Sequence, residues 1–295
     1  MFKNIPIYYS ILLFLGCASY DINDMEINTT TSISIEEKVG QMIMIRMDGK
    51  FHNSESSRKK YIKDLISNYK IGGLITFSGS VHGTFNNIKN YQNISDTPLL
   101  IASDYERGIG VFVDGTLFPS NMALAATQDT SYAYMQGKIT AIEAKSLGVN
   151  MILAPVLDIN NNKNNPIINF RSYGDTPETV VKYGIPFIRG IEDNGLIACA
   201  KHYPGHGNTA TDSHTSLPTI DITKEELYQN ELYPFRKACS IGVKSIMVGH
   251  IMIPSMDKNN PSTFSKKITE DILRVEWNYP GLIITDALEM GALTS

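Results

Sequence analysis

Three histidines, a lysine and an aspartate lie within fourteen residues, about two thirds of the way along the chain. The segment 201–214 reads KHYPGHGNTATDSH and holds three of the chain's six histidines. It follows the apolar run 196–200 and then turns to glycine, proline and small polar residues, so we expect a long loop leaving the carboxyl end of a strand. Imidazole and carboxylate groups on such a loop can move protons near neutral pH. The segment is therefore the first candidate for a catalytic site.

Asp212 and His214 lie two residues apart, in the sequence Asp-Ser-His. Residues two apart face the same side of an extended segment, and a carboxylate bound to imidazole fixes its tautomer and favours its protonated form. The alternative is that Asp212 caps a turn and that His214 is an ordinary loop histidine. We expect His206 to shape the loop. Together with His202 these residues lack the helical spacing of familiar zinc sites, so no metal is predicted.

Apolar, strand-like runs alternate with helical patterns along the rest of the chain. The expected strands are 39–45, 71–77, 98–103, 149–157, 196–200, 243–248 and 282–285. The expected helices include 58–70, 131–147, 176–194, 223–241 and 267–277. Thr223 and Glu226 form a capping box at the start of one of them. This alternation predicts parallel strands covered on both faces.

Polar residues directly follow several of these strands. They are Asp104, Asp158, Lys201, His202, His250 and Asp286. A (β/α)8 TIM-barrel-like fold would bring these strand ends to one rim, whereas an open sheet would spread them along an edge. We therefore predict an α/β barrel. Only seven strands precede Ser295, so the barrel is expected to be truncated before its eighth strand, with two strand edges and some core side chains exposed.

Two segments resemble the β-N-acetylglucosaminidase branch of glycoside hydrolase family 3. They are 201–214 and ITDALEMG at 284–291, and the resemblance covers 35–295. It implies the N-terminal barrel domain of that family over 35–295. It also implies a retaining mechanism with Asp286 as nucleophile and His214, assisted by Asp212, as acid/base. No cofactor is implied.

The resemblance further implies a set of sugar-binding residues. They are Asp104, Arg171, Lys201 and His202, with Arg107 as a further candidate. Eight residues after Asp104, where many family members carry a substrate-binding arginine, this chain has Phe112, and Arg107 is the candidate to compensate. Arg171 could instead pair with Asp175 or Asp158, and Asp158 could orient its neighbours.

The composition describes a globular protein without a nucleic-acid surface. Hydrophobic residues make up 42% of the chain, and 26 basic against 30 acidic residues give a net charge of −4 with no basic block. Cys199 and Cys239 lie in apolar runs, which favours core packing over a disulfide framework. We expect a monomer.

Residues 1–17 have the pattern of a lipoprotein-type signal peptide. A weakly basic start precedes an apolar run, 5–15, that is too short to span a bilayer, and Gly16-Cys17 follows. Cys17 is the expected lipidation site and 18–34 the expected tether; an ordinary signal peptide ending near Ala18 is the alternative. The expected location is outside the cytoplasm, lipid-anchored on the periplasmic side or at the cell surface.

These features predict an exo-acting, retaining β-N-acetylglucosaminidase that releases terminal N-acetylglucosamine from peptidoglycan fragments or related oligosaccharides. One alternative is a β-N-acetylglucosaminide phosphorylase, since a histidine acid/base does not repel phosphate as a carboxylate would. The other is a non-catalytic, truncated sugar-binding lipoprotein, favoured by Phe112 and by the count of seven strands.

Overall fold

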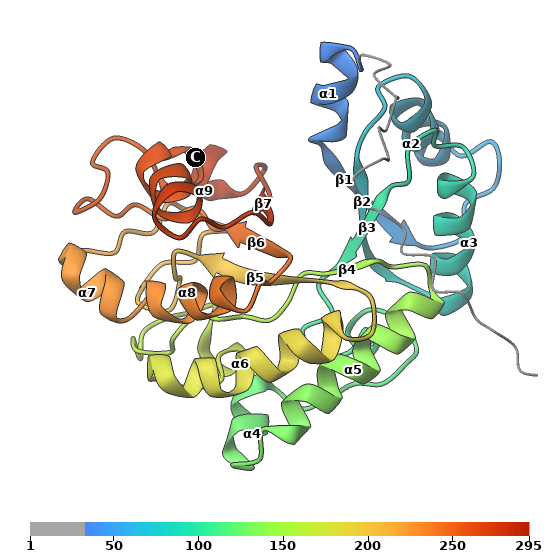
Figure 1. The fold of residues 1–295 in the computed structure, drawn as a ribbon. Helices are drawn as coiled ribbons and strands as arrows, with labels where there is room; N and C mark the ends of the chain where they lie inside the picture. The colour runs from blue at the N-terminus through green and yellow to red at the C-terminus, as the bar shows by residue number, and fades with distance from the viewer. Residues whose placement is uncertain (1–32, 295) are drawn as a thin grey trace, which may run out of the picture.

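A parallel sheet of seven strands runs through residues 33–294, the part of the chain that this computed structural model describes. The strands are β1 (Met44–Gly49), β2 (Gly73–Gly79), β3 (Leu100–Ser103), β4 (Met151–Ile152), β5 (Ile197–Tyr203), β6 (Ser245–Val248) and β7 (Leu282–Thr285). Each strand pairs with the next one in the chain, so the spatial order is the sequence order. Figure 1 shows the sheet curled into a half-barrel that carries its helices on the outside.

Helices connect successive strands, as the alternating pattern predicts. They are α1 (Ile35–Gln41), α2 (Ser57–Ser67), α3 (Val81–Gln92), α4 (Asn121–Ala126), α5 (Ser131–Ser146), α6 (Pro177–Glu192), α7 (Lys224–Gln229), α8 (Leu232–Ser240), a π-helix (Lys267–Glu276) and α9 (Gly291–Thr294). The Thr223–Glu226 capping box is present at the start of α7. The expected helix 223–241 is divided into α7 and α8, because the backbone leaves helical geometry at Asn230.

The curled sheet separates two apolar clusters. The larger cluster lies between the sheet and its outer helices. The smaller one fills the inside of the curl with Ala102, Met151, Leu153, Cys199 and Met247. Cys199 is fully buried there and Cys239 packs against the larger cluster, both as free thiols, which confirms the packing prediction for each.

The eighth strand does not occur within residues 33–294, so β1 and β7 are the two edges of the described sheet. Apolar side chains beside these edges reach solvent: Met42 next to β1 is 84% exposed and Leu282 in β7 is 40% exposed. The described sheet is therefore a curled, unclosed arrangement.

The prediction for the first strand was wrong. Residues 39–41 belong to α1, which begins at a capping box between Ser34 and Glu37, and β1 starts at Met44. The apolar side chains that indicated a strand, such as Val39 and Ile43, are 52% and 44% exposed, so they are not core residues. The fourth strand is also much shorter than the predicted 149–157.

The predicted signal peptide, the lipidation site Cys17 and the tether, apart from its last two residues, lie outside the described residues. Between residues 33 and 294, none of the helices combines the length and apolar character needed to cross a bilayer.

Candidate active site

Three ionic side chains lie at or near the carboxyl ends of strands β3, β5 and β7. They are Asp104, Lys201 and Asp286, and each lies two residues after a side chain of the interior cluster or packed against it: Ala102, Cys199 and Ile284. Because side chains alternate along extended chain, the three ionic groups continue the interior rows and emerge at the carboxyl rim of the curl. The three strands thus place the charged side chains of Asp104, Lys201 and Asp286 at the same rim.

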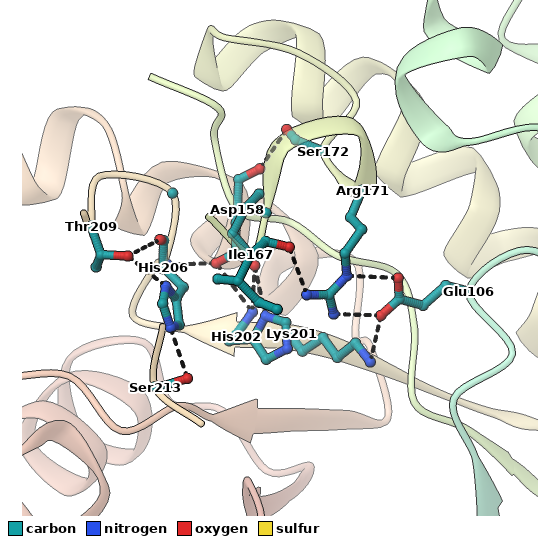
Figure 2. A network of polar contacts seen from close by, with 12 residues as sticks. Glu106, Asp158, Ile167, Arg171, Ser172, Lys201, His202, His206, Thr209 and Ser213 are labelled. Carbon is teal, nitrogen blue, oxygen red and sulfur yellow. Dashed lines mark hydrogen bonds and ion pairs between the residues drawn. The ribbon is translucent and has the colours of Figure 1, made fainter. Parts of the chain in front are cut away.

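Lys201 and Arg171 share the carboxylate of Glu106. Lys201 Nζ lies 2.5 Å from Asp104 Oδ1. It also lies 2.9 Å from Glu106 Oε1, and Arg171 donates to both oxygens of Glu106 at 3.0 and 2.7 Å (Figure 2). Burial alone would raise the pKa of Glu106, but the charges of Lys201 and Arg171 outweigh it and hold that pKa well below its usual range. Four charges therefore balance in pairs beside the rim.

Asp158 is a buried organiser of the histidine-containing segment. Its carboxylate is fully buried and accepts from the main-chain N–H of His202, from His202 Nδ1 at 2.7 Å, and from the main-chain N–H of His206 at 2.6 Å (Figure 2). Burial would raise the pKa of Asp158, yet the histidines facing it lower that pKa. His202 Nδ1 is thereby occupied, which leaves Nε2 as the ring atom able to meet a ligand.

Asp286 is held at the end of β7 by main-chain bonds. Its N–H donates to Val248 at 2.8 Å and its Oδ1 accepts from the N–H of Ala287 at 2.8 Å. Burial would raise the pKa of Asp286, but His202, the Ala287 N–H and Lys201 together keep it below its ordinary value. The carboxylate is therefore ionised at neutral pH, as a nucleophile must be.

The Asp212–His214 pair forms, but not in the predicted backbone. His214 Nδ1 lies 2.7 Å from Asp212 Oδ1, and the same oxygen accepts from the His214 main-chain N–H at 2.9 Å. This is a local turn closed by the aspartate side chain, and not an extended segment. The His214 side chain is 61% exposed, so its other ring nitrogen is open to a substrate.

Main-chain bonds join this turn to the chain that follows Asp286. Gly291 N donates to His214 O at 3.1 Å and Ala292 N donates to Ser213 O at 3.0 Å, so α9 packs against the turn. No hydrogen bond within residues 33–294 links Asp286 directly to the Asp212–His214 pair; the two are related through α9.

Gly207 permits a close approach of two segments. A Cβ at this position would collide with the main-chain oxygen of Ile159.

The expected shaping role of His206 agrees with its burial, at 2% exposure, and with the pairing of both its ring nitrogens, to Thr209 and Ser213.

The two predicted sugar-binding arginines differ in their contacts. Arg171 pairs with Glu106 and with neither Asp175 nor Asp158, so both of those pairings were wrong. Arg107 enters the hydrogen bonds of the described chain only through its carbonyl, which accepts from Phe118.

Phe112 lies in an aromatic cluster. Its ring centroid is 5.6 Å from that of Phe77 and 6.2 Å from that of Tyr105. The guanidinium of Arg46 stacks over Phe77 at 4.5 Å. The position thus supplies packing and no charge.

Glu106 is the residue that sequence reasoning missed. It lies two residues after Asp104, so the alternation of side chains in extended chain was the available signal that both face the same side. Its partners could not be predicted in this way, because Arg171 and Lys201 lie far from Glu106 in the sequence.

Across residues 33–294, no group of three or more histidine, cysteine, aspartate or glutamate side chains is arranged to hold a metal ion.

Comparison with known proteins gives a consistent set of similarities. Residues 34–295 match the glycosyl hydrolase family 3 N-terminal domain. β-Hexosaminidase A of Pseudoalteromonas piscicida is 33% identical over 302 residues, covering 89% of this chain and 50% of that protein. A family 3 β-N-acetylglucosaminidase from Paenibacillus superposes with a TM-score of 0.83 at 38% identity, over 89% of this chain and 51% of the other.

A structure described as the β-glucoside phosphorylase BglX superposes with a TM-score of 0.82 at 29% identity, over 89% of this chain and 48% of the other. The chain thus spans about half the length of these relatives.

Proposed function

The chain belongs to glycosyl hydrolase family 3, and on that premise we propose that it is a retaining exo-β-N-acetylglucosaminidase. Its substrates would be peptidoglycan fragments or related oligosaccharides that end in N-acetylglucosamine. The observation that carries the proposal is the Asp212–His214 pair: its exposed imidazole stands on a turn that is hydrogen-bonded to the segment after Asp286.

In the first step Asp286 attacks the anomeric carbon. The bond between that carbon and the glycosidic oxygen breaks, its electron pair stays on the oxygen, and protonated His214 supplies the proton. Asp212, bound to Nδ1, stabilises the imidazolium and leaves Nε2 as the donating atom. The product is a covalent glycosyl ester of Asp286.

In the second step water attacks the anomeric carbon of the ester. His214, now neutral, takes a proton from that water, and the bond to the Asp286 oxygen breaks. Two inversions at one carbon return the sugar with its original configuration. His214 therefore has to gain and lose a proton in each cycle, which an imidazole does readily near neutral pH.

The charged rim is suited to hold the terminal sugar during both steps. Asp104 is 29% exposed at its side chain while Lys201 is only 3% exposed, so the carboxylate is the more accessible member of that ion pair. Carboxylate oxygens accept from sugar hydroxyls, and Lys201, Arg171 and His202 Nε2 can complete the set with donors or acceptors.

The test is turnover of an aryl β-N-acetylglucosaminide by the purified protein and by its Asp286→Asn variant. We expect chromophore release that the variant reduces by about 10³-fold or more, since a nucleophile acts as part of a unit. Asp221→Asn is the matched control and should retain activity, because Asp221 is exposed and its side chain makes no hydrogen bond or ion pair within residues 33–294. Saturable sugar binding without turnover by the unmodified protein would overturn the proposal in favour of a non-catalytic binder.

A phosphorylase is the second candidate, and one specific observation favours it. A β-glucoside phosphorylase is among the similar structures, and the acid/base here is a histidine, which does not repel an incoming phosphate. Reaction in phosphate buffer separates the two functions. Formation of N-acetylglucosamine in phosphate buffer would support hydrolysis. Formation of N-acetylglucosamine 1-phosphate would instead show that the protein is a phosphorylase.

The proposal includes export and lipid anchoring through Cys17. The supporting pattern is the basic start, the short apolar run and the Gly16-Cys17 pair. Replacement Cys17→Ser should move the protein from the membrane fraction to the soluble fraction of cells that express it. Equal membrane association of both forms would count against the anchor.

A further inference from the structure

The buried ring of His206 connects two parts of the site that the proposed chemistry uses separately. It is 2% exposed, so no substrate can reach it. Its Nε2 lies 2.9 Å from Ser213 Oγ and its Nδ1 lies 2.8 Å from Thr209 Oγ1 (Figure 2). Since one nitrogen of a neutral imidazole donates and the other accepts, and a hydroxyl can do either, both contacts are satisfied without a charge on the ring.

On one side His206 is fixed to the sugar-binding rim. Its main-chain N–H donates to Asp158 Oδ1 at 2.6 Å, and Asp158 Oδ2 receives His202 Nδ1 at 2.7 Å. The same carboxylate thus sets the orientation of His202 and the position of His206. Asn165 adds two bonds to this segment through the carbonyls of His206 and Gly207.

On the other side His206 holds the turn that carries the acid/base. Ser213 stands between Asp212 and His214 and is 3% exposed, whereas the side chains of Asp212 and His214 are 30% and 61% exposed. The Ser213 carbonyl also accepts from Ala292 N. Ser213 is therefore the buried residue that anchors the turn: its side chain is hydrogen-bonded to His206 and its carbonyl to α9.

We propose that His206 is a positioning residue for general acid/base catalysis, acting through Ser213 on the Asp212–His214 pair. It transfers no proton to the substrate. Its task is to keep His214 at one distance from the glycosidic oxygen of a sugar that is bound by His202, whose ring Asp158 orients. This inference rests on the proposed function.

The main expectation concerns leaving groups. A positioned general acid contributes about 10²–10⁴-fold, and only where the leaving oxygen needs a proton. A shift of the acid by about 1 Å can remove about 10²-fold of this. Ser213→Ala should therefore lower kcat by about 10²-fold on an N-acetylglucosaminyl disaccharide, with little change in KM. On an aryl glycoside with an acidic phenol it should lower kcat by less than about tenfold.

The matched control is Ser216→Ala, the same substitution three residues later. The Ser216 side chain makes no hydrogen bond within residues 33–294, so this variant should match the unmodified protein on both substrates. Equal losses of Ser213→Ala on the two substrates would mean a purely structural effect and would overturn the proposal. So would a Ser213→Ala variant that behaves like Ser216→Ala.

Two substitutions of His206 test the same point if Ser213→Ala does not fold. A glutamine amide reaches the place of Nε2 and keeps the partner Ser213, whereas an asparagine amide reaches the place of Nδ1 and keeps the partner Thr209. On the disaccharide we expect His206→Gln to exceed His206→Asn by about tenfold or more, with similar rates on the activated aryl glycoside. Equal rates of the two variants on the disaccharide would refute the role of the Ser213 contact.

Failure of the proposed function would be recognised separately. It would show as absence of turnover in the unmodified protein on both substrates. If the unmodified protein is active and His214→Ala shows the leaving-group dependence while Ser213→Ala does not, the function stands and the positioning role falls.

Discussion

Replacement of Glu106 by glutamine removes one charge from the centre of the rim network with almost no change of shape. The carboxylate lies 2.7 and 3.0 Å from the Arg171 guanidinium and 2.9 Å from Lys201 Nζ. The side chains of Glu106, Arg171 and Lys201 are 15%, 22% and 3% exposed. In Glu106→Gln, Lys201 would keep its ion pair with Asp104, whereas Arg171 would lose the ion pair that it makes with Glu106.

The expected cost follows from these distances and exposures. Two opposite charges 2.7 Å apart attract by about 6 kcal/mol at an effective dielectric constant of 20. Desolvation of the ions offsets part of this attraction, and breaking a buried pair by removing one partner costs about 3–5 kcal/mol. The glutamine carbonyl still accepts one hydrogen bond, so we expect the lower end, about 3 kcal/mol.

The assay is thermal unfolding at pH 7, followed by calorimetry. For a domain of this size about 1 kcal/mol corresponds to about 2–4 °C, so Tm should fall by about 6–12 °C. Glu55→Gln is the matched control: Glu55 lies 2.7 Å from Lys60 Nζ, but its side chain is 79% exposed. Loss of such a surface pair costs about 0–1 kcal/mol. Equal decreases in Tm for the two variants would refute the claim that the ion pairs of Glu106 stabilise the fold more than a solvent-exposed ion pair does.

Three further predictions concern the loop, a cap and acid stability. Gly207→Ala should lower Tm or abolish soluble expression, because the alanine Cβ would collide with the Ile159 carbonyl oxygen. Thermal unfolding, together with the yield of soluble protein compared with that of the unmodified chain, tests this. Thr223→Ala removes the α7 cap and should lower the free energy of unfolding by about 1 kcal/mol in a denaturant titration. The pKa values of Glu106 and Asp158 are lowered in the fold, so the stability they provide is full above their unfolded pKa values and is lost as pH falls below them; Tm measured against pH should decrease steeply under about pH 4.

The sequence allowed good prediction where the signal was local. The seventh strand has the bounds expected from its apolar run, and the Thr223 cap opens a helix because its hydroxyl and the Glu226 side chain satisfy neighbouring N–H groups. The first strand failed for a local reason as well. The Ser34–Glu37 capping box commits residues up to Gln41 to a helix, and the apolar residues there face solvent, so apolar content alone was misleading.

The pairing of site residues could not be predicted from local pattern. Lys201 and Asp104 are 97 residues apart in the chain, and Arg171 and Glu106 are 65 apart. Which carboxylate meets which cation depends on how strongly the sheet curls between β3 and β5. The sequence offered Asp175 and Asp158 as partners for Arg171 because they are close in sequence, whereas the curl places Glu106 against it.

The contrast between the strand ends and the 212–214 turn explains why the site was only partly foreseeable. At the strand ends a two-residue alternation fixes the direction of each side chain, so Asp104, Lys201 and Asp286 had to emerge on one face once the strands were recognised. The turn has no such periodicity. Its two functional side chains are oriented by the local bonds of Asp212 and by the buried Ser213, whose partner His206 lies seven residues earlier. Loop sites of this kind depend on side-chain contacts that hold the backbone, so their geometry follows only from the folded structure.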